Sequence, residues 1–101
     1  MIKRMKLSAY LTRTEDGKYQ ARSFLHDKTE IRYTVTEHDV TLNEISNKEV
    51  EGFVFVKQIG AQDTRVYVEL PEGTDLHGKH VTVNKYSLVD PAYKIQDYLQ
   101  K

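Results

Sequence analysis

Cysteine is absent from this sequence of 101 residues. The absence excludes a disulfide framework, a thiolate metal site and a cysteine nucleophile. Glycine is sparse, and the clustered glycines that cradle phosphates do not occur, so the sequence indicates no nucleotide and no other cofactor. Each glycine stands alone at a place that suits a turn or a strand edge: Gly17, Gly52, Gly60, Gly73 and Gly78.

A long hydrophobic run is also missing, because no stretch approaches the roughly 20 apolar residues that cross a bilayer. Residues 1–7 carry the positive charges of a signal peptide, but Ser8, Tyr10 and Thr12 interrupt the apolar stretch that should follow. We therefore expect a mature cytoplasmic protein that makes no contact with a membrane.

Net charge is the third absence, since fifteen Lys and Arg residues balance fifteen Asp and Glu residues. A balanced chain does not coat nucleic acid through bulk electrostatics. The charges are nevertheless segregated along the sequence. Residues 1–36 hold eight basic and four acidic side chains, residues 37–76 hold three and nine, and residues 77–101 hold four and two. This pattern predicts either a basic and an acidic face or, if the strands interleave, no separate faces.

Alternation of apolar and polar residues predicts a chain made mainly of β-strands. The clearest case is residues 5–13, which end just before Asp16-Gly17, a strong hairpin signal. The most apolar run, residues 52–59, forms a second hairpin with the alternating run that follows it, and this hairpin is expected at the core. Strands are predicted at about residues 5–13, 18–26, 30–36, 39–45, 52–59, 64–70 and 79–88.

Two stretches allow more than one structure. Residues 41–49 suit the end of a strand and a loop, but Thr41 and Glu44 can also form the capping box of a helical turn. In the last strand the phase of the alternation shifts near Asn84 and Lys85, which indicates a β-bulge.

A short C-terminal helix is predicted at about residues 91–100. Asp90 is a favourable N-cap, and Pro91 suits the first helical position, where its missing N–H has no partner to lose. Ten residues are too few for a helix to persist alone, so this one either covers the domain's own core or docks on a partner. Its apolar stripe consists of Ala92, Ile95, Tyr98 and Leu99.

Together these elements predict a mainly β protein, a β-rich α+β fold. Residues 1–101 are enough for one domain with its own core. Six to seven strands joined by short connections favour a single antiparallel β-barrel or sandwich, completed by one short C-terminal α-helix.

The outward faces of the predicted strands carry aromatic side chains interleaved with Lys and Arg. Single-stranded nucleic acid needs such a face, because bases stack on rings while cations follow the phosphates. The same residue pairs can also stabilise a sheet without any ligand. The candidate binding residues are Lys6, Tyr10, Arg22, Phe24, Arg32, Arg65 and Tyr67.

Catalytic and metal-binding patterns are weak. Asp75, His77 and His80 offer the ligand types of a zinc ion, but their spacing fits neither one helix face nor one strand face. Glu37 and Asp39 would share one strand face as a carboxylate pair. The sequence favours a protein that is not an enzyme, with a small metal-dependent enzyme at Asp75, His77 and His80 as a further alternative.

Contacts with other proteins are the favoured function. An acidic segment at residues 37–51 and the tyrosines Tyr86, Tyr93 and Tyr98 suit docking, because tyrosine offers a large contact area with a polar tip. The sequence thus predicts a non-catalytic binding or assembly module whose partner is another protein or a second copy of the chain. Binding of single-stranded nucleic acid is the alternative.

Overall fold

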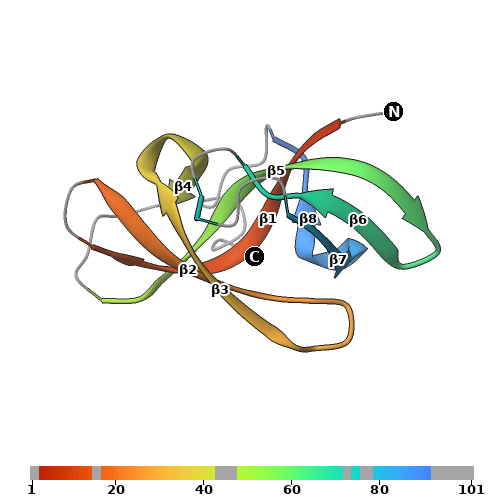
Figure 1. The fold of residues 1–101 in the computed structure, drawn as a ribbon, viewed down its shortest axis with the longest axis horizontal. Helices are drawn as coiled ribbons and strands as arrows, with labels where there is room; N and C mark the ends of the chain where they lie inside the picture. Colours follow the sequence, from red (N-terminus) through yellow and green to blue (C-terminus); the bar gives the residue numbers. More distant parts are fainter. Residues whose placement is uncertain (1–2, 15–16, 43–47, 72–73, 76–78, 92–101) are drawn as a thin grey trace, which may run out of the picture.

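The computed structural model describes residues 3–14, 17–42, 48–71, 74–75 and 79–91 (Figure 1). They form one curled antiparallel sheet, which confirms the prediction of a mainly β protein. The predicted helix at 91–100 lies outside the described residues, apart from Pro91. The elements are β1 (Lys3–Arg13), β2 (Lys18–Phe24), β3 (Glu30–Thr36), the 3-10 turn η1 (Glu37–Asp39), β4 (Val40–Leu42), β5 (Val50–Gln62), β6 (Arg65–Glu69), β7 (His80–Asn84), the 3-10 turn η2 (Lys85–Ser87) and β8 (Leu88–Val89).

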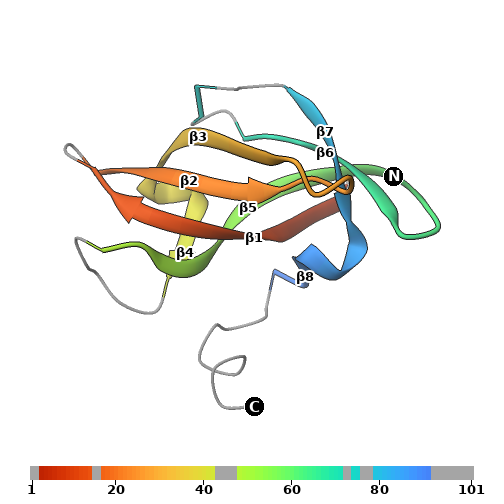
Figure 2. The same ribbon diagram turned by 90° about the horizontal axis from the view of Figure 1, so that it is seen from below.

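The two long strands, β1 and β5, organise the sheet. They pair with each other from Lys3 opposite Gln58 to Leu11 opposite Val50. Each divides its other edge between two shorter strands: β1 pairs with β8 and then with β2, and β5 pairs with β4 and then with β6. The sheet therefore runs β3-β2-β1-β5-β4 at one end of the long strands and β8-β1-β5-β6-β7 at the other (Figure 2).

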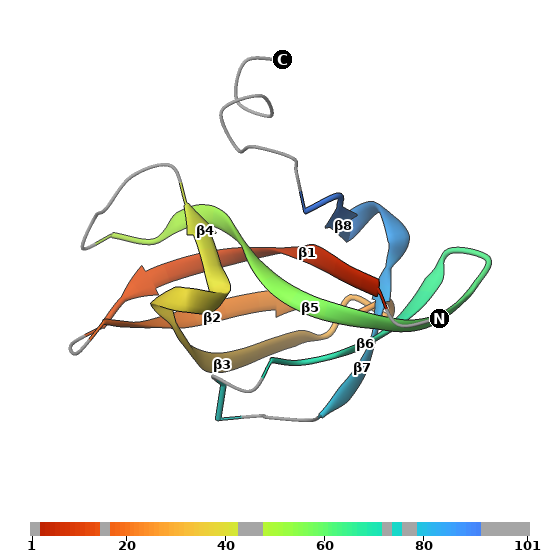
Figure 3. The same ribbon diagram turned by 90° about the horizontal axis from the view of Figure 1, so that it is seen from above.

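The sheet curls into a half-barrel, with β4 along the edge of β5 and β8 along the edge of β1 (Figure 3). Two backbone hydrogen bonds join the two edges of the curled sheet. One connects the turn between β2 and β3 to β7, and the other connects the segment between β6 and β7 to β3. The backbone N–H of His26 donates to the carbonyl of Thr82 at 2.9 Å, and the backbone N–H of Asp75 donates to the carbonyl of Thr34 at 3.1 Å. Of the predicted alternatives, the structure is thus closer to a barrel than to two separate sheets.

The core fills the inside of the curl. It is built by every second residue of six strands, as the alternation in the sequence predicts. Val54 and Val56 of β5 point inward, whereas Phe53 and Phe55 lie on the outer face of the same strand. The buried apolar residues in contact are Leu7, Ala9, Leu11, Tyr19, Ala21, Tyr33, Val35, Val54, Val56, Val66, Val68, Leu70, Val81 and Val83.

Several predicted strands have other bounds. The strand expected at 52–59 is longer and runs as β5 from Val50 to Gln62. The strand expected at 18–26 stops at Phe24, because a turn follows in which Asp27 Oδ1 accepts the N–H of Thr29 at 2.9 Å. The strand expected at 79–88 is divided into β7, η2 and β8. Strand β7 pairs with β6 and β8 pairs with β1, and the turn η2 connects them. The shift in the alternation near Asn84 is therefore caused by this turn and not by a β-bulge. A register shift of that kind occurs instead in β5, between Gln58 and Gly60.

The strand expected at 39–45 is described only as β4, Val40–Leu42. The 3-10 turn η1 precedes it, and residues 43–47 lie outside the described residues, as do parts of the predicted helical alternative. None of the helical segments that the structure describes is long and apolar enough to cross a membrane.

A buried polar pair lies within the core. Ser23 donates its hydroxyl to the backbone carbonyl of Ser8 at 3.1 Å, which leaves its oxygen to accept from the hydroxyl of Tyr33 at 2.9 Å. Tyr33 is only 1% exposed, and burial raises the pKa of its hydroxyl to about 12.

The buried hydroxyl of Tyr33 makes stability depend on alkaline pH. Its pKa is higher in the folded state than in the unfolded state, so its contribution is complete below about pH 10 and is lost between about pH 10 and 12. We expect the free energy of unfolding, measured by urea titration, to fall by about 1.4 kcal/mol from this group between about pH 8 and 11. Tyr33→Phe should lack that decrease. Tyr67→Phe, at a half-buried surface site, is the control, and an equal decrease in all three proteins would refute the prediction.

Candidate functional site

Two rows of side chains cross the outer face of β3, β2, β1 and β5. In the first row, Arg32, Arg22, Tyr10 and Glu51 lie directly opposite one another on successive strands. The second row lies two residues further along each strand. The sequence produces both rows because alternate residues of a strand share a face and the neighbouring strands fix their register. The second row consists of Glu30, Phe24, Ser8 and Phe53.

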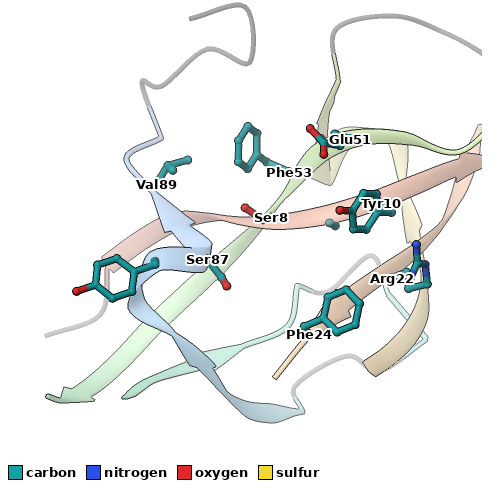
Figure 4. Close-up of a pocket in the computed structure, with 11 residues that line it drawn as sticks. Ser8, Tyr10, Arg22, Phe24, Glu51, Phe53, Ser87 and Val89 are labelled. Atoms are coloured by element: carbon teal, nitrogen blue, oxygen red, sulfur yellow. The ribbon is translucent and has the colours of Figure 1, made fainter. Parts of the chain in front are cut away.

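A cleft of about 260 Å³ opens over the second row (Figure 4). Its floor is Ser8 and Ala9, and the small side chain of Ser8 lies between Phe24 and Phe53. Strand β2 pairs with β1 no further than Tyr10, and β8 pairs with β1 only at residues 6–7. The cleft therefore lies beside the part of β1 that pairs with neither β2 nor β8.

The far wall of the cleft comes from η2 and β8. Tyr86, Ser87 and Val89 line it. The turn is fixed by Asn84, whose side-chain oxygen accepts the N–H of Tyr86 at 2.9 Å. The side chain of Tyr86 is 77% exposed, and the ammonium of Lys85 lies 5.1 Å from its ring centre. The predicted docking residue Tyr86 thus stands at the rim of the cleft, whereas Tyr93 and Tyr98 lie outside the described residues.

Arg22 is held at the other end of the cleft. Its guanidinium lies 4.7 Å from the ring centre of Tyr10 and 5.8 Å from that of Phe24. It donates to Glu30 at 2.7 Å and makes two bonds to Glu49, at 2.9 and 3.1 Å. These carboxylates raise the pKa of Arg22, and Arg22 in turn lowers the pKa of both carboxylates. Its charge is therefore already compensated within the chain.

Two further charges complete this end. Arg32 donates to Glu30 at 2.8 Å, so Glu30 binds two guanidinium groups. Glu51 lines the cleft opposite Tyr10 and is exposed. It makes no ion pair with any residue in the part of the chain that the structure describes. Of the described side chains named at this end, two arginines face three carboxylates, so their summed charge is negative.

Lys6 was expected on the exposed face, but its residue is only 5% exposed. It lies on the outer side of β1, opposite Phe55 on one neighbour and Val89 on the other. Its ammonium is 5.5 Å from the ring centre of Phe55 and 6.0 Å from that of Phe53. Burial lowers the pKa of Lys6, the charge of Arg4 lowers it further, and Asp90 opposes both. Phe55 and Val89 flank this lysine on the two neighbouring strands, so it is not displayed.

Arg65 and Tyr67 do not join the Tyr10 row. They lie on β6, which is separated from β1 by β5. Tyr67 contacts Gln62 at 3.5 Å through its hydroxyl. Arg65 borders a separate and more open hollow of about 270 Å³ with Leu25, His26, Asp27 and Thr82. The predicted face is therefore divided, with Tyr10, Arg22, Phe24 and Arg32 together and Arg65 and Tyr67 apart.

Two of the three proposed metal ligands are described, and each contacts another residue. Asp75 accepts the N–H of Thr34 at 2.8 Å through Oδ1, which ties it to β3. His80 on β7 lies 3.1 Å from Glu69 through Nε2. His77 is not among the described residues, and no group of three potential ligands occurs among those that are. Glu37 and Asp39, expected on a strand face, lie in η1.

Sequence reasoning missed the residues that shape the cleft: Ser8, Glu51, Phe53, Ser87 and Val89. One signal was available. Ser8 is the small residue between Lys6 and Tyr10 on the outward face of the first strand. Glu49, a partner of Arg22, carries no such signal, because it is distant from Arg22 in sequence and lies beside it only in the folded sheet.

Comparisons with protein-family models, with curated proteins and with solved structures found no match.

The two carboxylates that hold Arg22 provide a test of the site's electrostatics. In Arg22→Gln the pKa of Glu49 should rise toward its ordinary value, because Arg22 is the main cause of its lowering. The pKa of Glu30 should rise less, since Arg32 still binds it. Carbon-detected NMR titration of the Glu carboxyls measures both values. Arg32→Gln is the matched control, which should raise the pKa of Glu30 and leave that of Glu49 low. An unchanged Glu49 in Arg22→Gln would contradict this arrangement.

Proposed function

We propose that this protein is a non-catalytic binding module that contacts other proteins through the cleft between β1, β2 and the η2–β8 wall. One observation carries the proposal. Among the described residues, the two large hydrophobic side chains that are exposed, Phe24 at 43% and Tyr86 at 77%, both line this cleft. Exposed aromatic groups gathered at one hollow are typical of protein interaction sites.

The size of the cleft supports a protein partner. Pockets for small molecules and cofactors usually enclose about 300–1,000 Å³. This cleft, at about 260 Å³, lies just below that range and suits one or two side chains inserted from another protein. Tyrosine and phenylalanine are also enriched at the centres of protein interfaces, where each buries a large area. A second copy of this chain and a different protein both meet this description.

The charges support a protein over a nucleic acid. Binding of nucleic acid depends on cations that are available to phosphates. Arg22 and Arg32 are instead bound to Glu30 and Glu49, and Lys6 is buried. The carboxylate of Glu51 in the same cleft would repel a phosphate.

The lining also supports binding over catalysis. Among the residues described around the cleft, the hydroxyls of Ser8 and Ser87 have no histidine beside them that would act as a base. The one cation there, Arg22, is held by two carboxylates and two rings.

Filling the cleft tests this function. Ser8→Phe places a large side chain on the cleft floor, while Thr12→Phe adds the same bulk to the same face of β1, outside the cleft. Light scattering over a range of concentrations measures self-association. Affinity capture with mass spectrometry identifies another partner, whose affinity is then measured with purified proteins. We expect Ser8→Phe to weaken the complex by roughly thirtyfold, as loss of a central contact does, and Thr12→Phe to bind like the wild type.

Amide NMR spectra of both variants verify that they remain folded. Equal binding by Ser8→Phe and Thr12→Phe would show that the cleft is not the interface. Tight binding of a labelled single-stranded oligonucleotide that weakens steeply with salt would favour the nucleic-acid alternative instead.

A further inference from the structure

We infer that the partner presents an extended segment in which an aromatic side chain enters the cleft and a Lys or Arg two residues away pairs with Glu51. This inference rests on the proposed function and specifies the chemistry of the partner. It follows from three observations. The two ends of the cleft differ in charge, two of its three carboxylates are bound to arginines, and the two rows lie two residues apart along each strand.

The two ends of the cleft differ in character. Figure 4 shows Glu51, Tyr10 and Arg22 at one end and Val89 and Ser87 at the other, with Ser8 and Phe53 between them. The polar end carries the charges, and the middle is enclosed by phenylalanine rings. An apolar side chain fits the middle, and the phenylalanine rings that line it favour an aromatic one, because aromatic rings attract each other beyond the area that they bury. The neighbour of this side chain on the partner meets the charged end.

Glu51 is the carboxylate that remains available at the charged end. Glu30 and Glu49 are both bound to arginines. Glu51 has no ion pair among the described residues and faces the cleft. Water solvates this carboxylate in the free protein, but a partner that covers it must supply a compensating charge. A cation on the partner meets that need, whereas a carboxylate would be repelled.

The other charges around the cleft direct the cation to the same end. Arg22 and Arg32 are balanced by Glu30 and Glu49, which leaves Glu51 as the excess negative charge. At the opposite end, among the described residues, the cations of Lys85 and Lys6 outnumber the carboxylate of Asp90, so a further cation is disfavoured there. We therefore expect the partner's cation at the Glu51 end of the cleft and not at the Lys85 end.

The spacing of the two rows sets the spacing of the partner's side chains. Glu51 and Phe53 are two residues apart on β5 and share its outer face, a separation of about 7 Å along a strand. In an extended segment of the partner, residues i and i+2 also lie on one face at about this distance. The pattern is thus an aromatic residue and a basic residue separated by one position.

Blocked pentapeptides test this pattern on the full chain. The probes are acetyl-Gly-Tyr-Ser-Lys-Gly-amide and its reverse order, acetyl-Gly-Lys-Ser-Tyr-Gly-amide, each with versions in which Glu replaces Lys or Ala replaces Tyr. Titration to about 5 mM, followed by amide NMR shifts, covers the weak affinity of a one-anchor ligand. We expect shifts at Ser8, Phe53 and Tyr86, and one of the two orders should bind roughly two- to fivefold more tightly with Lys than with Glu.

Charge reversal provides the decisive comparison. In Glu51→Lys the preference should reverse toward the Glu peptide. In Glu37→Lys, a matched change at an exposed acidic residue away from the cleft, the preference for Lys should remain. The Ala version should lose the shifts in both proteins. No preference for Lys, an unaltered preference in Glu51→Lys, or no shift with any peptide would overturn the inference.

These failures are separable from failure of the proposed function. If Ser8→Phe abolishes a protein complex while the peptides show no preference for Lys, the cleft is an interface whose partner has a different chemistry. If Ser8→Phe has no effect on the complex and the peptides do not shift the cleft residues, both the function and this inference are refuted.

Discussion

The antiparallel pairing of β1 with β5 is the interaction on which the rest of this structure depends. Nine residue pairs join the two strands, and each strand then serves a different neighbour at each of its ends. A strand that belongs to two groups of neighbours has to bend between them, and this bend curls the sheet. The curl encloses the inward valines and leucines, and it places the cleft at the position where β1 changes neighbours.

The cleft is a consequence of this same change. A continuous ladder along β1 would cover its floor, whereas β2 ends its pairing at Tyr10 and β8 begins at residues 6–7. Ser23 partly replaces the missing ladder, because its hydroxyl binds the carbonyl of Ser8. The hydroxyl of Tyr33 then binds Ser23, so the cleft floor is connected to the core by two hydrogen bonds. A hollow on the outer face is in this way supported from within.

Local sequence patterns predicted the inside of the sheet well and the outside less well. Residues such as Leu7, Leu11 and Val68 are buried because of their own alternation, which can be read along a single strand. Burial of Lys6 depends on β8, a segment far along the chain, and the neutralisation of Arg22 depends on Glu49. Such features follow from register and from chain reversals like η2, which no local periodicity encodes. The row of Tyr10, Arg22 and Arg32 was recoverable because two adjacent hairpins set its register.

Strand β8, which forms part of the wall of the cleft, pairs with the sheet at two residues only, far fewer than the nine pairs that join β1 and β5. Segments held by few backbone bonds open at a lower free-energy cost than the global unfolding of the protein, and their amides exchange with solvent sooner. The floor and the Arg22 end belong to the long, well-paired strands. In the opposite wall Val89 belongs to β8, whereas Tyr86 and Ser87 belong to the turn η2, which Asn84 fixes. The two halves of the site thus differ in how they are held. Long pairing of β1 with β5 holds the floor, whereas two residue pairs and a capped turn hold the wall, whose amides we expect to exchange with solvent sooner.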